Sequence, residues 1–161
     1  MTMLLQKGQD FMKHSEKATE LFAKGYNCSQ AVFAAFCDET GMDEETALKI
    51  SSSFGGGMGR MREVCGAVSG MFMVAGMLYG YSDTEAKSKG EHYELIQKMA
   101  EKFKEKNHGT IICRELLQGI KTDAKPTPSE RNEHYYKVRP CVKFVMDASD
   151  ILDELIAEKN K

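Results

Sequence analysis

The stretch from Val64 to Tyr81 contains no charged residue over eighteen positions, although 29% of the whole chain is charged. A segment of this kind has to be buried, either in a bilayer or in a protein core. It is at the short limit for a membrane span, and its glycines make it only moderately hydrophobic. We therefore expect a central buried helix, in which the pairs Gly66-x-x-x-Gly70 and Gly76-x-x-x-Gly80 allow neighbouring helices to approach closely.

Helical patterns fill the rest of the chain, and no segment has the alternation of a β-strand. Apolar residues recur at helical spacing, and glycines or prolines separate the segments. The predicted helices are 11–24, 28–40, 44–50, 64–81, 83–107, 111–118 and 141–159, with a loop at 121–133. Because 161 residues suit one domain and 42% of them are hydrophobic, we predict a single all-α domain over residues 1–161, a bundle of six or seven helices.

The charge balance narrows the function classes. The chain has 22 basic and 24 acidic residues, for a net charge of -2. A sequence-independent nucleic-acid binder needs a basic surface, and a polybasic membrane anchor needs clustered Lys or Arg, so both classes are disfavoured. Met1–Leu5 is followed at once by polar residues, which leaves no apolar segment long enough for a secretory signal. We expect a cytoplasmic protein with reduced thiols and no membrane or nucleic-acid partner.

The five cysteines are the chemically distinctive feature of the sequence. An odd number fits poorly with a framework of structural disulfides. Four of them fall at predicted helix N-termini, where the helix dipole and free N–H groups lower the pKa of a thiol; these are Cys28, Cys65, Cys113 and Cys141. Arg60 and Arg62, just before Cys65, would act in the same direction. Cys37 lies nine residues after Cys28, on the opposite face of that helix, and we expect it to be buried or incidental.

The histidines are weak candidates for ligands of a metal site. Each of the four lies among charged neighbours, so we expect them at the solvated surface; they are His14, His92, His108 and His134. His134, beside two tyrosines, is a weak ligand candidate.

The order of the cysteines and glycines resembles a known family. The residues that carry the resemblance are Cys28, Cys65-Gly66-Ala67-Val68-Ser69-Gly70, Cys113 and Cys141, with the preceding Phe54-Gly-Gly-Gly-Met-Gly run. They are similar to the C_GCAxxG_C_C family of small bacterial and archaeal redox-active proteins, from about Tyr26 to Cys141. The label writes Gly before Cys, whereas Cys65 precedes Gly66 here. The resemblance implies a redox role for the four cysteines.

A weaker similarity is to the non-haem part of split-Soret cytochromes, which implies that the four cysteines hold an iron–sulfur cluster. The sequence has no C-x-x-C-H, so no covalent haem is expected.

The first hypothesis is a redox metal centre for electron transfer, most simply [2Fe–2S], with Cys28, Cys65, Cys113 and Cys141 as thiolate ligands. Gly66, Ala67 and Gly70 would leave room beside the cofactor, and Arg60 would lie next to it. A zinc site with four cysteines is less favoured, because such sites usually bring paired ligands. The partner would be a redox protein or a small thiol or oxidant, and a homodimer is compatible with the sequence.

Three alternatives remain open. The cysteines could form a thiol–disulfide relay with Cys65 as the attacking thiolate. The Gly55–Gly59 loop, with Arg60 and Arg62, could hold an anion in a binding module without enzyme activity, although no complete phosphate-binding motif is present. The cysteines could also be core filler, since free Cys is among the most buried residue types. Whether the protein is an enzyme therefore stays open.

Overall fold

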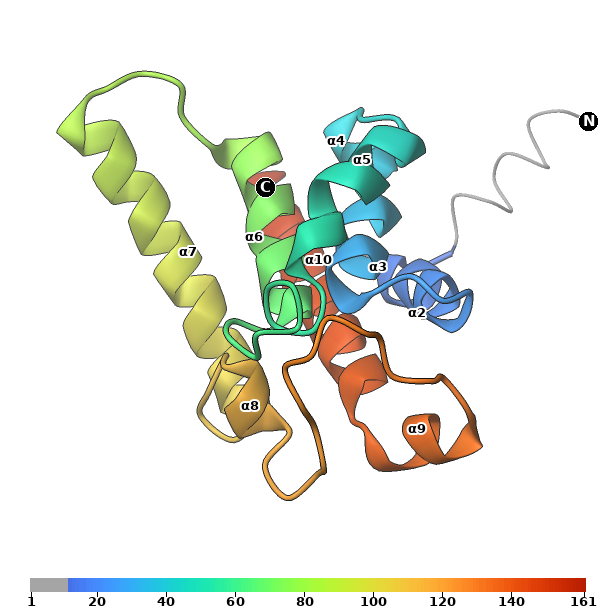
Figure 1. The fold of residues 1–161 in the computed structure, drawn as a ribbon. Coiled ribbons are helices and arrows are strands. Elements are labelled where there is room, and N and C mark those ends of the chain that lie inside the picture. Colours follow the sequence, from blue (N-terminus) through green and yellow to red (C-terminus); the bar gives the residue numbers. More distant parts are fainter. Residues whose placement is uncertain (1–11) are drawn as a thin grey trace, which may run out of the picture.

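The computed structural model describes residues 12–161 and confirms the all-α class (Figure 1). The elements are α2 (His14–Ala23), α3 (Cys28–Ala35), α4 (Cys37–Thr40), α5 (Glu44–Ser51), the 3₁₀ turn η1 (Ser52–Phe54), α6 (Gly66–Tyr79), α7 (Ala86–Lys106), α8 (Cys113–Leu116), α9 (Glu133–Val138) and α10 (Cys141–Lys159). In this part of the chain, the one isolated β-bridge pairs Val64 with Ile112. Phe11, where the first predicted helix begins, and Met1–Leu5 lie outside the described residues.

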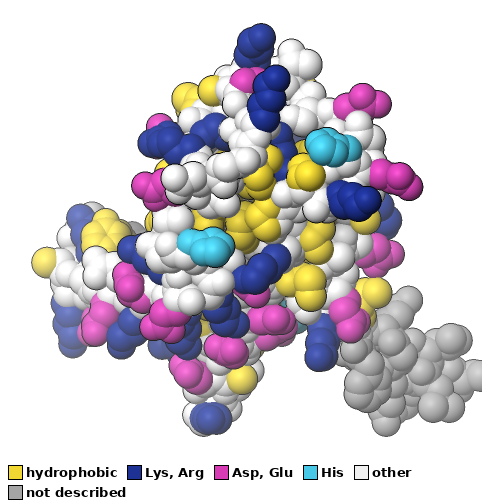
Figure 2. Space-filling view, turned by 90° about the horizontal axis from the view of Figure 1, so that it is seen from below, with side chains coloured by type: hydrophobic (Ala, Val, Ile, Leu, Met, Phe, Trp, Pro, Cys, Tyr) yellow, Lys and Arg dark blue, Asp and Glu magenta, His cyan; other side chains and the backbone are white. Residues whose placement is uncertain are grey.

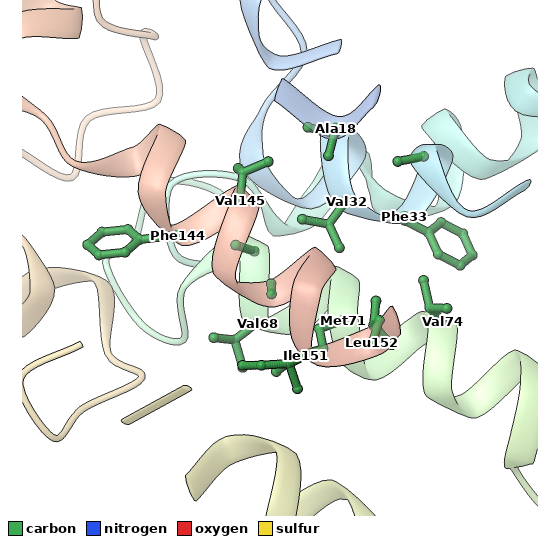
Figure 3. Packing of buried hydrophobic residues seen from close by; sticks show 14 of the residues in the cluster. Ala18, Val32, Phe33, Val68, Met71, Val74, Phe144, Val145, Ile151 and Leu152 are labelled. Carbon is green, nitrogen blue, oxygen red and sulfur yellow. The ribbon is translucent and has the colours of Figure 1, made fainter. Parts of the chain in front are cut away.

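The uncharged helix α6 is central, as predicted. It packs against α3 and α10, while α2 covers α3 and α10, and α7 lies against α6 and α10. Figure 3 shows side chains of α2, α3, α6 and α10 meeting in one core, where Val68, Met71 and Ile151 are fully buried. No helix among residues 12–161 is both long and apolar enough to cross a membrane.

The structure has nine α-helices in its described part, against the six or seven expected. The predicted helix 28–40 is divided at Phe36, whose backbone (φ −103°, ψ 18°) ends α3 and precedes α4. This break lets the Phe36 ring lie fully buried. The predicted loop is irregular as far as Asn132, which caps α9 by accepting a hydrogen bond from the Tyr135 N–H. Short helices of this kind have too few residues for a periodic pattern to identify them.

Only the first of the two glycine pairs serves a close helix contact. A Cβ on Gly66 would lie 2.9 Å from the Phe54 carbonyl oxygen, and one on Gly70 would lie 2.9 Å from the Ser29 carbonyl oxygen. At Gly76 nothing would lie within 4 Å, and at Gly80 the nearest atom is the carbonyl oxygen of Gly76 in the same helix. The expectation that the second pair also receives a neighbouring helix is therefore wrong.

His14 links three helices, which corrects the expectation of a solvated side chain. Its Nδ1 lies 2.6 Å from an oxygen of Asp153 on α10, and its Nε2 lies 2.9 Å from an oxygen of Asp38 on α4. The ring also stacks on Phe36 at 4.0 Å between centroids. Burial alone would lower the pKa of His14, but the hydrogen bonds and charges of Asp153 and Asp38 together raise it above 6.5. The His14 ring thus joins α2 to α4 and α10.

The glycine contacts predict opposite effects of one added methyl group. Gly70→Ala should lower the free energy of unfolding by about 1–3 kcal/mol, because α3 leaves no room for the Cβ. Gly76→Ala is the matched control on the same helix and should raise it by about 0.5–1 kcal/mol, since alanine favours the helix. Urea denaturation followed by circular dichroism measures both; equal effects of the two changes would contradict the packing.

The His14 pairs predict a pH-dependent stability. The folded protein holds the proton of His14 to a higher pH than the unfolded chain does, so its contribution is complete below the unfolded pKa of about 6.5 and is lost as pH rises through the folded pKa. The free energy of unfolding should therefore fall as the pH rises above about 6.5. His14→Gln should remove this component of the slope. Identical pH profiles of the two proteins in urea titrations would count against it.

Candidate functional site

Four cysteines from four separate elements line one cavity of about 430 Å³. Cys28, Cys113 and Cys141 are the first residues of α3, α8 and α10, and Cys65 directly precedes α6. The prediction that they lie at helix N-termini is thus confirmed. In Figure 1, the lower end of α6 lies beside α8, with the loop before α6 and the chain before α9 close by. On the face seen from below, hydrophobic side chains gather in the middle and charged ones surround them (Figure 2).

Local backbone pairing holds two of the thiols together. The Cys65 N–H donates to the Ile111 carbonyl at 2.8 Å, and the Cys113 N–H donates to the Glu63 carbonyl at 2.6 Å. These bonds flank the bridge between Val64 and Ile112. Cys65 and Cys113, which are 48 positions apart in the sequence, therefore lie side by side at the starts of α6 and α8. Cys28 is placed by its neighbour Asn27, which caps α3 through the Gln30 N–H.

The glycine loop (residues 55–63) fits between these helix starts because its backbone is left-handed. Residues 56–60 all have φ between +57° and +74°. A Cβ on Gly57 would lie 2.6 Å from the Cys113 Cβ, so this position requires glycine. Each N–H from Met58 to Glu63 donates to a carbonyl of residues 53–58. These six donors are therefore not available to a phosphate, which counts against the anion-binding alternative.

Several N–H groups point to the sulfurs instead. The Gly56 N–H donates to Cys28, and the N–H groups of Ala67 and Val68, in the first turn of α6, donate to Cys65. Gly66 lines the cavity as predicted. Gly70 does not line it and serves the contact with α3, which corrects its predicted place beside a cofactor.

The cavity is lined by four guanidinium groups and by no carboxylate of the described residues. The four are Arg60, Arg62, Arg131 and Arg139. Arg60 lines the cavity together with the thiols, and its guanidinium is bound by the segment that follows α8. It donates to the carbonyls of Lys125 and Thr127 and to the Ser129 hydroxyl.

The arginines hold a strap (residues 121–132) over the cavity. Pro126 and Pro128 of the strap are lining residues. At its far end, Arg131 donates to the carbonyls of Phe22 and Tyr26 at 2.6 and 2.8 Å. The strap contains no regular secondary structure, so these guanidinium bonds are its main attachments. Sequence reasoning treated this segment only as a loop and missed both its role and Arg131.

Tyr135 and Arg139 are further lining residues that sequence reasoning missed. The Arg139 guanidinium lies over the Tyr135 ring at 4.8 Å from its centroid. Burial raises the pKa of Tyr135 to about 12, and charge at Cys141 and Cys28 acts in the same direction. Both residues lie shortly before Cys141, as Arg60 and Arg62 lie shortly before Cys65. This shared position of an arginine before a cysteine could have predicted that Arg139 lies in the site.

The thiols differ sharply in acidity. A hydrogen bond with the Cys141 thiol is the main cause that lowers the pKa of Cys28 to about 7, helped by the Gly56 N–H and the charge of Arg131. The same hydrogen bond, with burial, raises the pKa of Cys141. Burial raises the pKa of Cys113, although Arg62 opposes it.

Cys65 has a raised pKa, so the expectation of a lowered one is wrong. Burial is the largest cause, and charge at Cys28 adds to it. Cys65 is only 4% exposed, and loss of hydration outweighs the N–H groups of α6. Cys28, which is partly exposed, is therefore the thiol that ionises first.

The remaining cysteine and the histidines lie away from this cavity. Cys37 begins α4, is partly exposed and is not a lining residue, and burial raises its pKa. His134 is exposed and borders a neighbouring cavity without contributing to the thiol cavity. Among residues 12–161, the thiols are all free.

A protein-family model described as "Putative redox-active protein (C_GCAxxG_C_C)" matches residues 26–155. This match spans most of the chain and includes all four cavity cysteines. No curated protein and no solved structure matches the chain.

The acidity order predicts which thiol reacts first in the reduced, metal-free protein. Cys28 should be alkylated by iodoacetamide before Cys65 and Cys141, and its rate should rise with pH through about 7 as the thiolate forms. Mass spectrometry of peptides after short pulses at several pH values measures each site. Cys37, with its raised pKa, is the internal comparison. Alkylation of Cys65 first would contradict this order.

Proposed function

Because the chain belongs to the C_GCAxxG_C_C family of redox-active proteins, we propose that its four cavity cysteines bind an iron–sulfur cluster, most simply [2Fe–2S], for electron transfer. The ligands would be Cys28, Cys65, Cys113 and Cys141. The observation that carries the proposal is their convergence, from four elements, on one cavity lined by four arginines and no described carboxylate. Four cysteine thiolates are the usual ligand set of such clusters. When bound, the cluster would supply a centre that accepts and releases one electron.

The charge of the lining supports an anionic, sulfur-rich occupant. Four thiolates carry more negative charge than the iron core of a [2Fe–2S] cluster neutralises, so the assembled group is an anion. The guanidinium groups of the cavity and the N-terminal ends of α3, α6 and α10 compensate negative charge. The buried Nη2 of Arg62 has no hydrogen-bond partner among residues 12–161, which is consistent with an unfilled place for an acceptor.

The backbone would tune such a cluster. The N–H of Gly56 is directed at Cys28, and those of Ala67 and Val68 at Cys65. Hydrogen bonds to ligand sulfurs are one of the levers that set the reduction potential, because they stabilise the more negative, reduced state. Strap residues Pro126 and Pro128 would exclude water from the same side.

The thiol spacing favours a cluster over a single zinc ion. In residues 12–161, the only three potential ligand atoms lying within 4.8 Å of one another belong to His14, Asp38 and Glu39. Thus no three cysteine sulfurs lie that close together, whereas sulfurs around one tetrahedral ion would be ~3.8 Å apart. The ligands of a cluster with more than one iron are spread more widely. His14 already binds Asp38 and Asp153 through its two nitrogens.

A second candidate function rests on the contact between Cys28 and Cys141. The hydrogen bond between these thiols and the lowered pKa of Cys28 favour disulfide chemistry. In that case Cys28, in place of Cys65, would attack a small disulfide and Cys141 would resolve the mixed disulfide. Two electrons and two protons would pass to the two thiols released. A redox protein or a small thiol or oxidant would be the partner in either case.

Metal content tests the proposal. Protein purified without oxygen should contain about two iron and two acid-labile sulfide atoms per chain and absorb visible light. Serine replacement at each cavity cysteine should remove most of the iron and absorbance. Cys37→Ser is the matched control and should retain both.

Two other results would reject a cluster. A colourless, metal-free protein that forms a reversible disulfide between Cys28 and Cys141 would establish the second candidate. Serine variants that change only the melting temperature would show that the cysteines are core filler.

A further inference from the structure

Arg62 is a buried cation that forms no salt bridge with any described residue, although its charge helps to lower the pKa of Asp123. Its side chain lies within the glycine loop, and the residue is 6% exposed. Its Nε donates to the Asp123 carbonyl at 2.9 Å, and its Nη1 lies 3.7 Å from the Cys113 sulfur. Its Nη2 is buried and has no hydrogen-bond partner among the described residues. The Asp123 carboxylate pairs with Arg60, at 3.4 Å.

Such an arrangement is unfavourable unless something compensates the charge. A buried cation loses its hydration, and an unsatisfied N–H adds to this penalty. The backbone adds a further cost, because Arg62 has φ +61°, where a side-chain-bearing residue is strained by about 1–2 kcal/mol. Unfavourable terms concentrated at one residue of a binding cavity indicate a function.

The other three cavity arginines are accounted for by the fold. Arg60 and Arg139 both donate to the Ser129 hydroxyl of the strap. Arg131 binds two carbonyls and lies over the Phe22 ring at 4.1 Å from its centroid. Among the cavity arginines of the described chain, Arg62 alone donates to a cysteine sulfur.

We propose that Arg62 is the positioning and charge-compensating residue of the cysteine site, which favours the reduced state of the bound cluster. The inference rests on the proposed function. One-electron reduction, by dithionite in the test below, adds one negative charge to the sulfur-ligated group and neither forms nor breaks a bond. A fixed guanidinium beside Cys113 stabilises that added charge strongly, because the surroundings exclude water. The unpartnered Nη2 provides a donor for the same anionic group.

The reduction potential tests this role. Arg62→Met keeps most of the side-chain volume and removes the charge, so the midpoint potential in a dithionite titration should shift downward. Arg62→Lys retains the charge and should lie between Arg62→Met and the wild-type protein.

Lys137→Gln is the matched control. Lys137 lies four residues before Cys141, but it is exposed and does not line the cavity, so solvent screens its charge. This variant should keep the wild-type potential. An Arg62→Met protein with full iron content and an unchanged potential would overturn the role of Arg62 and leave the cluster intact. Wild-type protein without iron would instead overturn the proposed function.

The metal-free chain provides a readout that does not depend on a cluster. If Arg62 is an uncompensated cation there, Arg62→Met should unfold at a higher urea concentration than the wild-type chain. If Arg62 only ties the strap through Asp123, the same change should lower that concentration. The second result would overturn the inference, and Arg62→Lys, which keeps the cation, should not gain the stability of Arg62→Met.

Discussion

Positive charge from helix N-termini and arginine side chains is concentrated around one cavity. This constraint limits what the cavity can bind. The helices α3, α6 and α10 direct their N-terminal ends, each with a partial positive charge, toward the same space. Four guanidinium groups surround it, and no described carboxylate does. Like charges repel strongly where water is excluded, so this cavity favours a thiolate or an anionic group. The proposed redox centre bound through sulfur would supply such a charge.

Much of this arrangement could be predicted from the sequence, because helix starts depend on local signals. The cap at Asn27 predicts that a helix begins at Cys28, and the uncharged run of α6 predicts that Cys65 lies at the start of the next one. Effects that depend on residues far apart in the sequence, such as the pKa of a buried thiol or the partners of an arginine, could not be predicted in this way. Burial outweighs the helix dipole at Cys65, and Arg60 bonds to the strap. Arg131 reaches the cavity only through the tertiary fold, so spacing in the sequence did not reveal it.

The glycine loop shows why the strained backbone is retained. Within one short segment it directs the Gly56 N–H to Cys28 and the Arg62 guanidinium to Cys113. The Arg62 carbonyl is fixed by both the backbone and the side chain of Arg114, which donate to it at 3.2 and 3.1 Å. Surroundings of this kind can hold a backbone conformation that the chain would not otherwise adopt. A relaxed loop would leave the two sulfurs without these donors.

The position of the strap in the sequence has a consequence for how the protein matures. Cys28, Cys65 and Cys113 all precede the strap, and Cys141 follows it. During synthesis the first three thiols are therefore made before the strap, and the fourth is made after it. The helix α10 supplies Cys141 and Phe144 to the lining, so the last helix of the chain is the element that completes the cavity.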